Sequence, residues 1–484
     1  MEPAGSTFFW SFVLFLLLAP LYKASNRPLP LLLLELAAIA FLFVMTQRGV
    51  LRTEVAALPR PLAIALGVLL AYPLLQLLPL PEFLWRLLPG HSEYVTVLEQ
   101  FAPAGAAHSM RTISIVPVAT EVGWLALLPP LACFFAAQWL HPGHVVRLLL
   151  AMAIFSGLEA LMGLLQVRAG RDSIVYWLSD IAYGTATGTF VNHNHFAAML
   201  AMTLPVIIGL LVYTIRYGRR RMRPAAFAFD PDALSQRVIV FASAMLILLC
   251  LLFTHSRAGI ATALAGLAFS SILLGRVRGG LKYANWIVGA LVISGIAVAA
   301  LIGLSPILRG FSPEQLGLSG EGRLALSAAT LRAAIEFLPF GSGLSTFADV
   351  FPRFQSDVFG GYIDHAHNDY LQLFMEVGLA APVIVALALA AYVIRVSELL
   401  RRDSRRSFTV LQIAAGVGLL PMILHSMFDF GIHMPANAMW FATFAGVMFH
   451  KGVLDQPAAT GKQGTSQREP LRGAGRQADD PALE

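Results

Sequence analysis

The sequence predicts an all-α integral membrane protein with about twelve transmembrane helices and a long outer loop that contains amphipathic helices. Three observations lead to this prediction. Of the 484 residues, 57% are hydrophobic and only 13% are charged, whereas a soluble domain has about 45–50% apolar and about 25% charged residues. The apolar residues form unbroken runs, and basic residues cluster between some of these runs. This composition excludes a cytosolic enzyme, a disordered chain and a nucleic-acid-binding protein.

The apolar runs define the expected spans, because a transmembrane helix needs about 20 apolar residues. About twelve runs qualify, near residues 7–22, 28–46, 61–80, 119–140, 145–167, 190–215, 237–254, 258–275, 284–305, 368–394, 408–427 and 434–450. A transmembrane barrel would instead show alternating segments of about ten residues. The first run has no basic residue before it, so we expect a retained span and not a signal peptide.

Basic residues predict the orientation, because cytoplasmic loops carry an excess of Lys and Arg. The clusters that we assign to cytoplasmic loops are Arg48, Arg52 and Arg60; Arg216–Arg223; Arg276, Arg278 and Lys282; and Arg395, Arg401, Arg402, Arg405 and Arg406. The long loop at about 306–366 has four arginines against six acidic residues. With an even number of spans, both termini are then expected in the cytoplasm and the long loop outside.

Three regions are expected along the chain. Residues 1–180 form N-terminal transmembrane helices, residues 181–450 form a second transmembrane domain, and residues 451–484 form a disordered cytoplasmic tail. The tail is polar and lacks the apolar residues that a core needs. No internal repeat is found, so an inverted-repeat transporter is not favoured. Cys133 and Cys250 lie inside apolar runs and predict neither a disulfide nor a thiol pair for a metal.

The long loop contains one clear pattern. Over residues 323–338, apolar residues recur at helical spacing and predict an amphipathic helix that lies on the membrane or on the bundle. They are Leu324, Ala328, Leu331, Ile335 and Leu338, whereas Arg323, Ser327 and Thr330 lie on another face. Gly341 and Gly343 follow, where missing side chains would let the backbone approach another segment closely.

Polar motifs at the expected outer ends of the spans are the candidate site. Nine of the 12 histidines are expected on this side, and seven lie in or beside four motifs. The motifs hold His193, Asn194 and His195 within 188–196; His255 and Arg257 within 254–259; His365, His367, Asn368 and Asp369 within 364–372; and His425, Asp429 and His433 within 425–437. Any single one could be an interfacial anchor, but seven histidines on one side favour a site.

The residue types suggest particular chemistry. A guanidinium such as that of Arg257 can hold a phosphate in bidentate fashion. A histidine in the third motif can act as a general base near neutral pH. His425 and Asp429 are four residues apart, share a helix face and could hydrogen-bond. The chain has neither an HEXXH motif nor a cysteine pair, so no metal site is predicted.

Taken in order, these motifs resemble the O-antigen ligase family of membrane glycosyltransferases. The family also includes O-antigen and exopolysaccharide polymerases and pilin O-oligosaccharyltransferases. The resemblance covers about residues 180–450. It rests on His367-Asn368 with nine residues before Gly378, on the Gly-X-Gly turn, on Ser256-Arg257-Ala258 and on the segment from His425 to Phe430.

The resemblance implies an active site on the periplasmic face of the bacterial inner membrane. It implies a glycan donor on undecaprenyl pyrophosphate, an acceptor hydroxyl on a sugar, lipid A-core or protein, and neither metal nor cofactor. His367 would be the base that deprotonates the acceptor, and Arg257 would bind the donor pyrophosphate. The residues that would support them are Asn368, Asp369, His193, Asn194, His195, His425 and Asp429.

Two positions depart from the family pattern. Relatives often carry an arginine where this chain has His193, and a neutral imidazole does not replace a permanent cation. We therefore expect Arg323 to be the second pyrophosphate-binding cation. After Gly378 the chain reads Leu379-Ala380-Ala381, without the second small or hydroxylated residue of ligases, which slightly favours a polymerase or an unassigned branch.

Two other functions stay open on the sequence. Glu35 and Glu159 lie deep in expected spans, where charge often marks a transport path, so a transporter or flippase of lipid-linked saccharides is the main alternative. Each carboxyl could equally be protonated or bonded to a neighbouring helix. A non-catalytic scaffold of a polysaccharide assembly complex is the third hypothesis. The concentration of polar residues at the outer boundary favours the enzyme.

Overall fold

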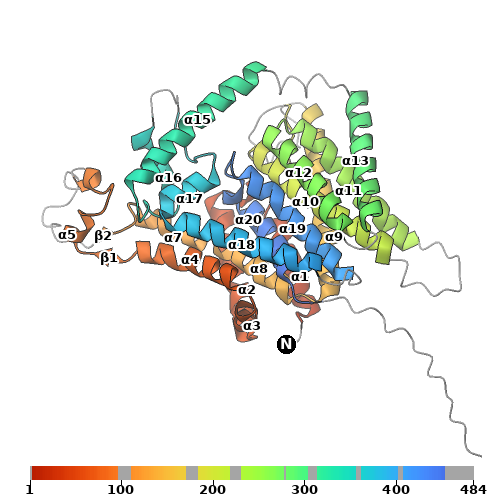
Figure 1. The fold of residues 1–484 in the computed structure, drawn as a ribbon, viewed down its shortest axis with the longest axis horizontal. Coiled ribbons are helices and arrows are strands. Elements are labelled where there is room, and N and C mark those ends of the chain that lie inside the picture. The colour runs from red at the N-terminus through yellow and green to blue at the C-terminus, as the bar shows by residue number, and fades with distance from the viewer. Residues whose placement is uncertain are drawn as a thin grey trace, which may run out of the picture. The chain divides into compact units, whose positions relative to one another are not determined.

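The structure of the protein is a computed structural model that describes residues 3–95, 111–169, 184–217, 231–276, 280–302, 313–355, 361–401 and 407–452. Most of these residues are helical (Figure 1). The expected tail and the histidine at position 108 lie outside the described residues, apart from the first two residues of the tail. Contacts join the chain up to Leu454 into one unit.

The described helices fall into two parts of the chain, before and after residue 170. The first part of the chain forms α1 (Ser6–Leu18), η1 (Lys23–Ser25), α2 (Pro28–Gln47), α3 (Val50–Ala56), α4 (Arg60–Gln76), α5 (Glu82–Trp85), α7 (Pro117–Leu125), α8 (Leu128–Trp139) and α9 (Pro142–Arg168). The second part forms α10 (His193–Tyr217), α11 (Pro231–Phe253), α12 (Arg257–Gly275), α13 (Gly280–Ile302), α15 (Pro313–Glu336), α16 (Phe347–Val350), η4 (Phe351–Phe354), α17 (Asp369–Val377), α18 (Ala380–Arg401), α19 (Ser407–His425), η5 (Gly431–His433) and α20 (Pro435–Phe449). Strands β1 (Pro79–Leu80) and β2 (Arg111–Thr112) pair antiparallel, with Pro79 opposite Thr112.

Eight helical runs within the described residues are long and apolar enough to cross a membrane. They are α2, α7 with α8, α9, α10, the Leu234–Phe253 part of α11, α12, α18 and α19. α1, α4 and the Ala284–Ser294 part of α13 are apolar but shorter. Each of the expected runs contains a helix, which confirms an all-α membrane protein. The count of twelve spans stays a prediction.

Two of the expected spans are broken. The run at 368–394 is α17 followed by α18, because Gly378 between them has a φ of +56° that ends the first helix. A Cβ at Gly378 would lie 2.2 Å from the carbonyl oxygen of Pro339, so the loop after α15 packs directly on this break. The run at 119–140 likewise divides into α7 and α8, which meet at Ala126 and Leu127.

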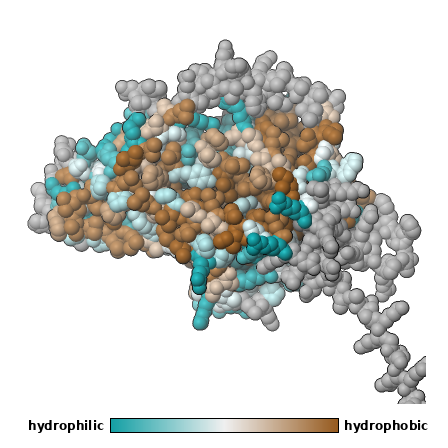
Figure 2. Space-filling view, in the orientation of Figure 1, coloured by the Kyte–Doolittle hydropathy of each residue, from teal (hydrophilic) through white to brown (hydrophobic). Residues whose placement is uncertain are grey.

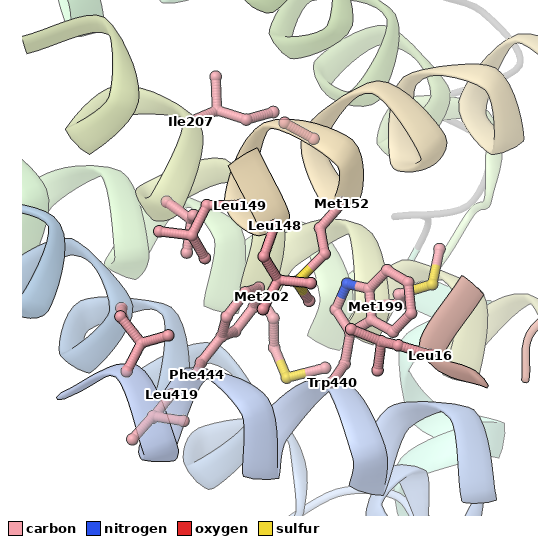
Figure 3. Close-up of a cluster of buried hydrophobic side chains, with 14 of the residues drawn as sticks. Leu16, Leu148, Leu149, Met152, Met199, Met202, Ile207, Leu419, Trp440 and Phe444 are labelled. Atoms are coloured by element: carbon pink, nitrogen blue, oxygen red, sulfur yellow. The ribbon is translucent and has the colours of Figure 1, made fainter. Parts of the chain in front are cut away.

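The core lies around α10, and nearly every residue of this helix from Phe196 to Val212 is buried. Small residues let neighbouring helices approach it. A Cβ at Gly209 would meet Ala414 of α19, and a Cβ at Gly259 of α12 would meet Ala197. Figure 3 shows the packed side chains, which come from α1, α9, α10, α19 and α20 and include Met152, Met199, Met202, Trp440 and Phe444.

The outer faces of several helices are apolar, as expected for a protein in lipid (Figure 2). Large apolar side chains are exposed along α2 and α18, for example Leu33, Phe43, Val383 and Val393. No water-soluble fold would leave such faces uncovered at this length. Some polar residues are buried within the helices, among them Glu35, Glu159 and Arg395, whereas the histidine-rich motifs lie at helix ends and in loops.

The expected loop helix forms as part of α15, but its buried face differs from the expectation. Leu324, Leu331 and Ile335 are 72%, 41% and 58% exposed. The buried residues are Leu326, Ala329, Thr330, Ala333, Ala334 and Phe337. This second face packs on α17, where small residues permit close approach. The apolar stripe read from the sequence is therefore the outward face of the helix.

Arg395 also differs from its expected place in a basic loop. It lies within α18 and is only 6% exposed. Its guanidinium donates to the carbonyl oxygens of Met448 and His450 and to Glu398. Arg395 therefore caps the last turn of α20 and is not a free loop cation. Cys133 and Cys250 are free cysteines, and both are buried.

Gln76 links the first part of the chain to the loop that carries the site. Its Nε2 donates to the carbonyl oxygens of Phe340, at 3.0 Å, and Glu376, at 2.9 Å. Its Oε1 accepts from the backbone N–H of Leu344 at 3.1 Å. Because Gln76 is buried at the end of α4, these three bonds fix the glycine-containing turn against α17.

Candidate active site

The four polar motifs meet at one end of the helix bundle. α10 and α12 run in the same direction and begin there with His193 and Arg257, while α19 runs in the opposite direction and ends there with His425. The packing of Gly259 on Ala197 brings the first turns of α10 and α12 together. The structure thus gathers residues that are far apart in the sequence, as the motifs suggested.

His367 and Asp429 form a hydrogen-bonded pair in this cluster. His367 Nδ1 lies 3.0 Å from Asp429 Oδ1. The Asp429 side chain is 1% exposed, whereas the His367 side chain is 33% exposed. Because the carboxylate can only accept, Nδ1 carries the proton and Nε2 keeps its lone pair. A solvent-reachable imidazole held in this tautomer can act as a general base.

Asp429 is held as an anion by the residues around it. His195 Nε2 lies 3.7 Å from its Oδ1, and His425 Nε2 lies 3.9 Å from its Oδ2. The backbone N–H of Phe430 donates to Oδ1 at 2.9 Å. Burial alone would raise the pKa of Asp429, but the interactions with His195 and His367 hold it well below its usual range. His425 therefore lies near Asp429 without the expected hydrogen bond, and His367 is the main partner.

The backbone around His367 is fixed on both sides. His367 itself has a φ of +48°, which is unusual for a residue with a side chain. Asn368 caps α17, since its Oδ1 accepts from the N–H groups of Tyr370 and Leu371. The N–H of Asp369 donates to the carbonyl oxygen of Ser426 at 2.9 Å. Asn368 therefore supports the site by orienting the helix that follows the base.

A second histidine–carboxylate pair lies beside the first. His433 Nδ1 is 2.6 Å from Asp369 Oδ1, and Gln372 Nε2 is 3.2 Å from His433 Nε2. Burial alone would lower the pKa of His433, but the bond to Asp369 raises it above its ordinary value. The sequence placed Asp369 in a supporting role, yet it gave no sign of this partner 64 positions away.

Phe430 organises the imidazoles around it. The ring centroids of His195, His365 and His367 lie 4.4, 4.1 and 4.8 Å from the Phe430 centroid. His365 is stacked at 15°, whereas the other two meet the ring edge-on. The third motif contains His365 and the fourth contains Phe430, but the sequence indicates a role for neither. The stacking of His365 on Phe430 joins two segments far apart in the chain, which the motifs themselves do not predict.

Arg257 lies at the start of α12, which Ser256 caps by accepting from the N–H of Gly259 at 3.1 Å. His255, just before it, has a φ of +56° and forms the tight turn that the sequence suggested. Neither α10 nor α12 has an acidic residue in its first turn. The N-termini of both helices and the Arg257 guanidinium lie at this corner, and both kinds of group favour an anion.

The residues of the motif at the start of α10 make different contacts. The His193 ring bonds to the backbone of Thr254, while its Nδ1 has no hydrogen-bond partner among the described residues. His195 is held through its carbonyl oxygen, to which Asn437 Nδ2 donates at 3.0 Å. The N–H of Asn194 donates to Asn192 at 2.8 Å, which caps the turn. No described contact brings the Asn194 side chain to Asp429.

Arg323 lies on α15 and is half-buried. Its charge acts on His425, so the loop helix brings this cation within electrostatic reach of the site. The role of Arg323 as the second pyrophosphate-binding cation stays a prediction. Within the described part of the chain, no three side chains are grouped as metal ligands, and independence from metal stays a prediction.

Glu159 has a structural partner. Its carboxylate accepts from the N–H of Thr189 at 3.0 Å and from the Thr189 hydroxyl at 3.1 Å. Gln166, two turns further on α9, accepts from the N–H groups of Thr187 and Gly188. These bonds hold the loop that leads into α10. Glu35 is also buried, and its Oε1 has no partner among the described residues.

Residues 242–386 match a family model whose description is O-antigen ligase. The matched segment runs from α11 into α18 and includes Arg257, Arg323, His367, Asn368 and Asp369. The match supports the family assignment that the motifs predicted. No curated protein matches the chain. The remaining site residues lie outside the matched segment, and the packing of the helices brings them to the same end of the bundle. They are His193, Asn194, His195, His425 and Asp429.

Proposed function

Given this O-antigen ligase family domain, we propose that the protein is an inverting glycosyltransferase of the bacterial inner membrane. It moves a glycan from undecaprenyl pyrophosphate to a hydroxyl of a sugar, lipid A-core or protein, on the periplasmic face, during assembly of a surface polysaccharide. The family supports the coarser part of this statement, a membrane glycosyltransferase of the O-antigen ligase type. The observation that carries it is the His367–Asp429 pair.

His367 acts as the general base in the proposed reaction. Its Nε2 takes the proton of the acceptor hydroxyl, while Asp429 stabilises the imidazolium that forms. The acceptor oxygen attacks the anomeric carbon, and the bond from that carbon to the pyrophosphate oxygen breaks with its electron pair. One glycosidic bond forms, one glycosyl–phosphate bond breaks, and configuration inverts because the displacement is direct.

Arg257 and Arg323 bind the pyrophosphate leaving group and stabilise its negative charge. The pyrophosphate gains negative charge as the bond breaks, and stabilising such developing charge is usually a large part of catalysis. Arg257 stands at a corner with two helix N-termini and no first-turn acid. Arg323 approaches from α15 and supplies the second permanent charge.

The periplasmic orientation rests on the distribution of charge. The site lies at the end opposite to Arg48, Arg52 and Arg60, which lie in α3 or just outside its ends. Positive loops face the cytoplasm, so the site faces the periplasm and both termini are cytoplasmic. The segment after Gly378 slightly favours a polymerase or an unassigned branch over a lipid A-core ligase.

A transporter or flippase of the same lipid-linked saccharides is the second candidate. The buried Glu35, whose Oε1 lacks a described partner, is the observation that favours it. Against it, Glu159 is engaged by Thr189 in holding a loop, and both histidine–carboxylate pairs of the candidate site lie at one end of the bundle. The enzyme is therefore the better-supported function.

The test compares purified wild type with His367→Ala and with His141→Ala in detergent. His141 is exposed at the opposite end of the bundle, at the start of α9. Each protein receives a short glycan on undecaprenyl pyrophosphate, alone and with candidate acceptors, and products are followed by mass spectrometry. We expect a new glycosidic bond with wild type and His141→Ala and none with His367→Ala, which still binds the lipid.

The outcomes separate the candidates. Lengthening of the lipid-linked glycan without added acceptor identifies a polymerase, and dependence on an added acceptor identifies a ligase or protein transferase. Full turnover by His367→Ala would refute the mechanism. Lipid binding without any new bond, together with uptake into sealed vesicles, would instead establish the transporter.

A further inference from the structure

A chain of hydrogen bonds runs beside the His367–Asp429 pair and is not needed to hold that pair. It connects Asp369, His433, Gln372 and His365 in that order, and we call these four residues the relay. The distances along it are 2.6, 3.2 and 3.3 Å. Two groups outside the relay fix the orientation of the Gln372 side-chain amide. The position of each proton in the relay follows from that orientation.

The orientation of Gln372 follows from its two outer partners. The backbone N–H of Ala366 can only donate, and it points at Gln372 Oε1 at 3.1 Å. The carboxylate of Glu376 can only accept, and it lies 3.1 Å from Gln372 Nε2. The amide oxygen therefore faces Ala366 and the amide nitrogen faces Glu376. Gln372 is 2% exposed and buried between these partners, which favours a single orientation.

The proton positions on both histidines follow from this orientation. Gln372 Nε2 donates to His433 Nε2, so the proton of neutral His433 is on Nδ1, where it is donated to Asp369. Gln372 Oε1 accepts from His365 Nδ1, so that nitrogen carries the proton of His365. His365 Nε2 is then left with a lone pair. All the bonds of the relay point toward the carboxylate of Asp369.

His365 therefore has the same tautomer as His367, and both imidazole rings pack against the ring of Phe430. Both contact Phe430, His365 face-on with centroids 4.1 Å apart and His367 edge-on at 4.8 Å. Each ring has Nδ1 anchored, directly or through the relay, to a buried carboxylate. Burial and the neighbouring His433 lower the pKa of His365 to about 3, so this ring is neutral at physiological pH and accepts at Nε2.

We propose that His365 Nε2 accepts a hydrogen bond from a second hydroxyl of the acceptor, next to the hydroxyl that His367 deprotonates. The inference rests on the proposed function and narrows its acceptor to a molecule with neighbouring hydroxyl groups, which is a sugar. A serine or threonine side chain of a protein offers one hydroxyl and would leave His365 without a partner. His365 is thus a specificity-determining residue, whereas His433 and Gln372 are positioning residues that fix its tautomer.

The test uses substitutions that distinguish the donor function of His365 Nδ1 from the acceptor function of His365 Nε2. His365→Asn retains a donor near the Nδ1 position, where it can reach Gln372, and removes the acceptor at Nε2. His365→Gln places an amide oxygen near the Nε2 position. His141→Asn at the exposed end of α9 is the matched control, because asparagine preserves its capping role there.

Acceptor kinetics provide the readout. The probes are the glycan of the donor released as a free oligosaccharide, its derivative lacking one hydroxyl next to the reacting one, and a serine-containing peptide. We expect His365→Asn to raise the acceptor KM about tenfold, the effect of one lost hydrogen bond, with donor binding unchanged. His365→Gln and His141→Asn should stay closer to wild type.

The deoxy derivative makes the test independent of folding defects. Wild type should use it about tenfold less well than the full oligosaccharide, while His365→Asn should not distinguish the two. Equal use of both by wild type, an unchanged acceptor KM in His365→Asn, or transfer to the peptide alone would each overturn the inference while leaving the glycosyltransferase intact. No transfer to any acceptor by wild type would refute the proposed function itself, and the inference with it.

Discussion

The imidazole of His367 and the carboxylate of Asp429 lie 3.0 Å apart although 62 positions separate them in the chain. His367 stands just before α17, and Asp429 stands between α19 and η5. The pair exists only because the loop after α15 is fixed against the end of α19. Its chemistry can be tested by changing each partner in turn.

Asp429→Asn should reduce the rate of glycosyl transfer about 100- to 10,000-fold, the usual contribution of a general base. The amide has the shape of the carboxylate, but its nitrogen can donate to His367 Nδ1 and so favour the wrong tautomer. Initial rates measured by mass spectrometry provide the test. A rate within about twofold of wild type would show that His367 does not depend on Asp429.

The relay predicts how acceptor affinity depends on pH. Above the raised pKa of His433 its ring is neutral, and Nε2 accepts from Gln372. As pH falls through this pKa, Nε2 gains a proton and faces the amide N–H group of Gln372, donor against donor. The acceptor KM should therefore rise toward acid pH. Asp369→Asn removes the anion that raises the pKa of His433, so the rise should move to lower pH, and an unshifted profile would contradict the assignment.

Arg257 should act on the donor and not on the acceptor. Arg257→Lys retains the charge but loses bidentate geometry, and Arg257→Ala loses both. We expect kcat/KM for the lipid-linked donor to fall about tenfold or more in the alanine variant, the equivalent of one charge-assisted bond, and less in the lysine variant. Acceptor KM should not change. Equal losses in both variants would indicate that geometry, and not charge, is what Arg257 provides.

Gly378 should be essential to stability. Its φ of +56° and the carbonyl oxygen of Pro339 at 2.2 Å leave no room for a Cβ. Gly378→Ala should destabilise the fold by about 1–3 kcal/mol and lower the Tm in detergent. Gly67→Ala is the matched control, because a Cβ there meets nothing within 4 Å and helix α4 should be slightly stabilised. Equal Tm values for the two variants would contradict this account of the break between α17 and α18.

The fold class could be read from the sequence because lipid imposes a simple rule. A membrane span must be a run of apolar residues, and every expected run contains a helix. The break at Gly378 could not be read, since glycine is common in transmembrane helices and the contact with Pro339 is made by a distant loop. The buried face of α15 was also misjudged, because alanines at Ala329 and Ala333 make a close contact that hydrophobicity undervalues.

The candidate site could be predicted only in part. The sequence suggested a base, a cation and their neighbours, because His, Asn and Arg are unusual at the ends of apolar runs. It paired His425 with Asp429 from helical spacing, whereas the structure pairs Asp429 with His367 and Asp369 with His433. Those partners come from segments about sixty residues apart, and spacing along one helix carries no information on such contacts.

The separation of His367 from Asp429 has a consequence for the time at which activity arises. Translation delivers His367 to the membrane 62 residues before Asp429 is made. Until α19 has been inserted, the imidazole has no carboxylate to fix its tautomer, and Ser426 is not there to receive the N–H of Asp369. A truncated chain that contains the matched family segment but ends before α19 should therefore be inactive. Activity appears only when the last helices of the bundle have been synthesised and folded against the earlier ones.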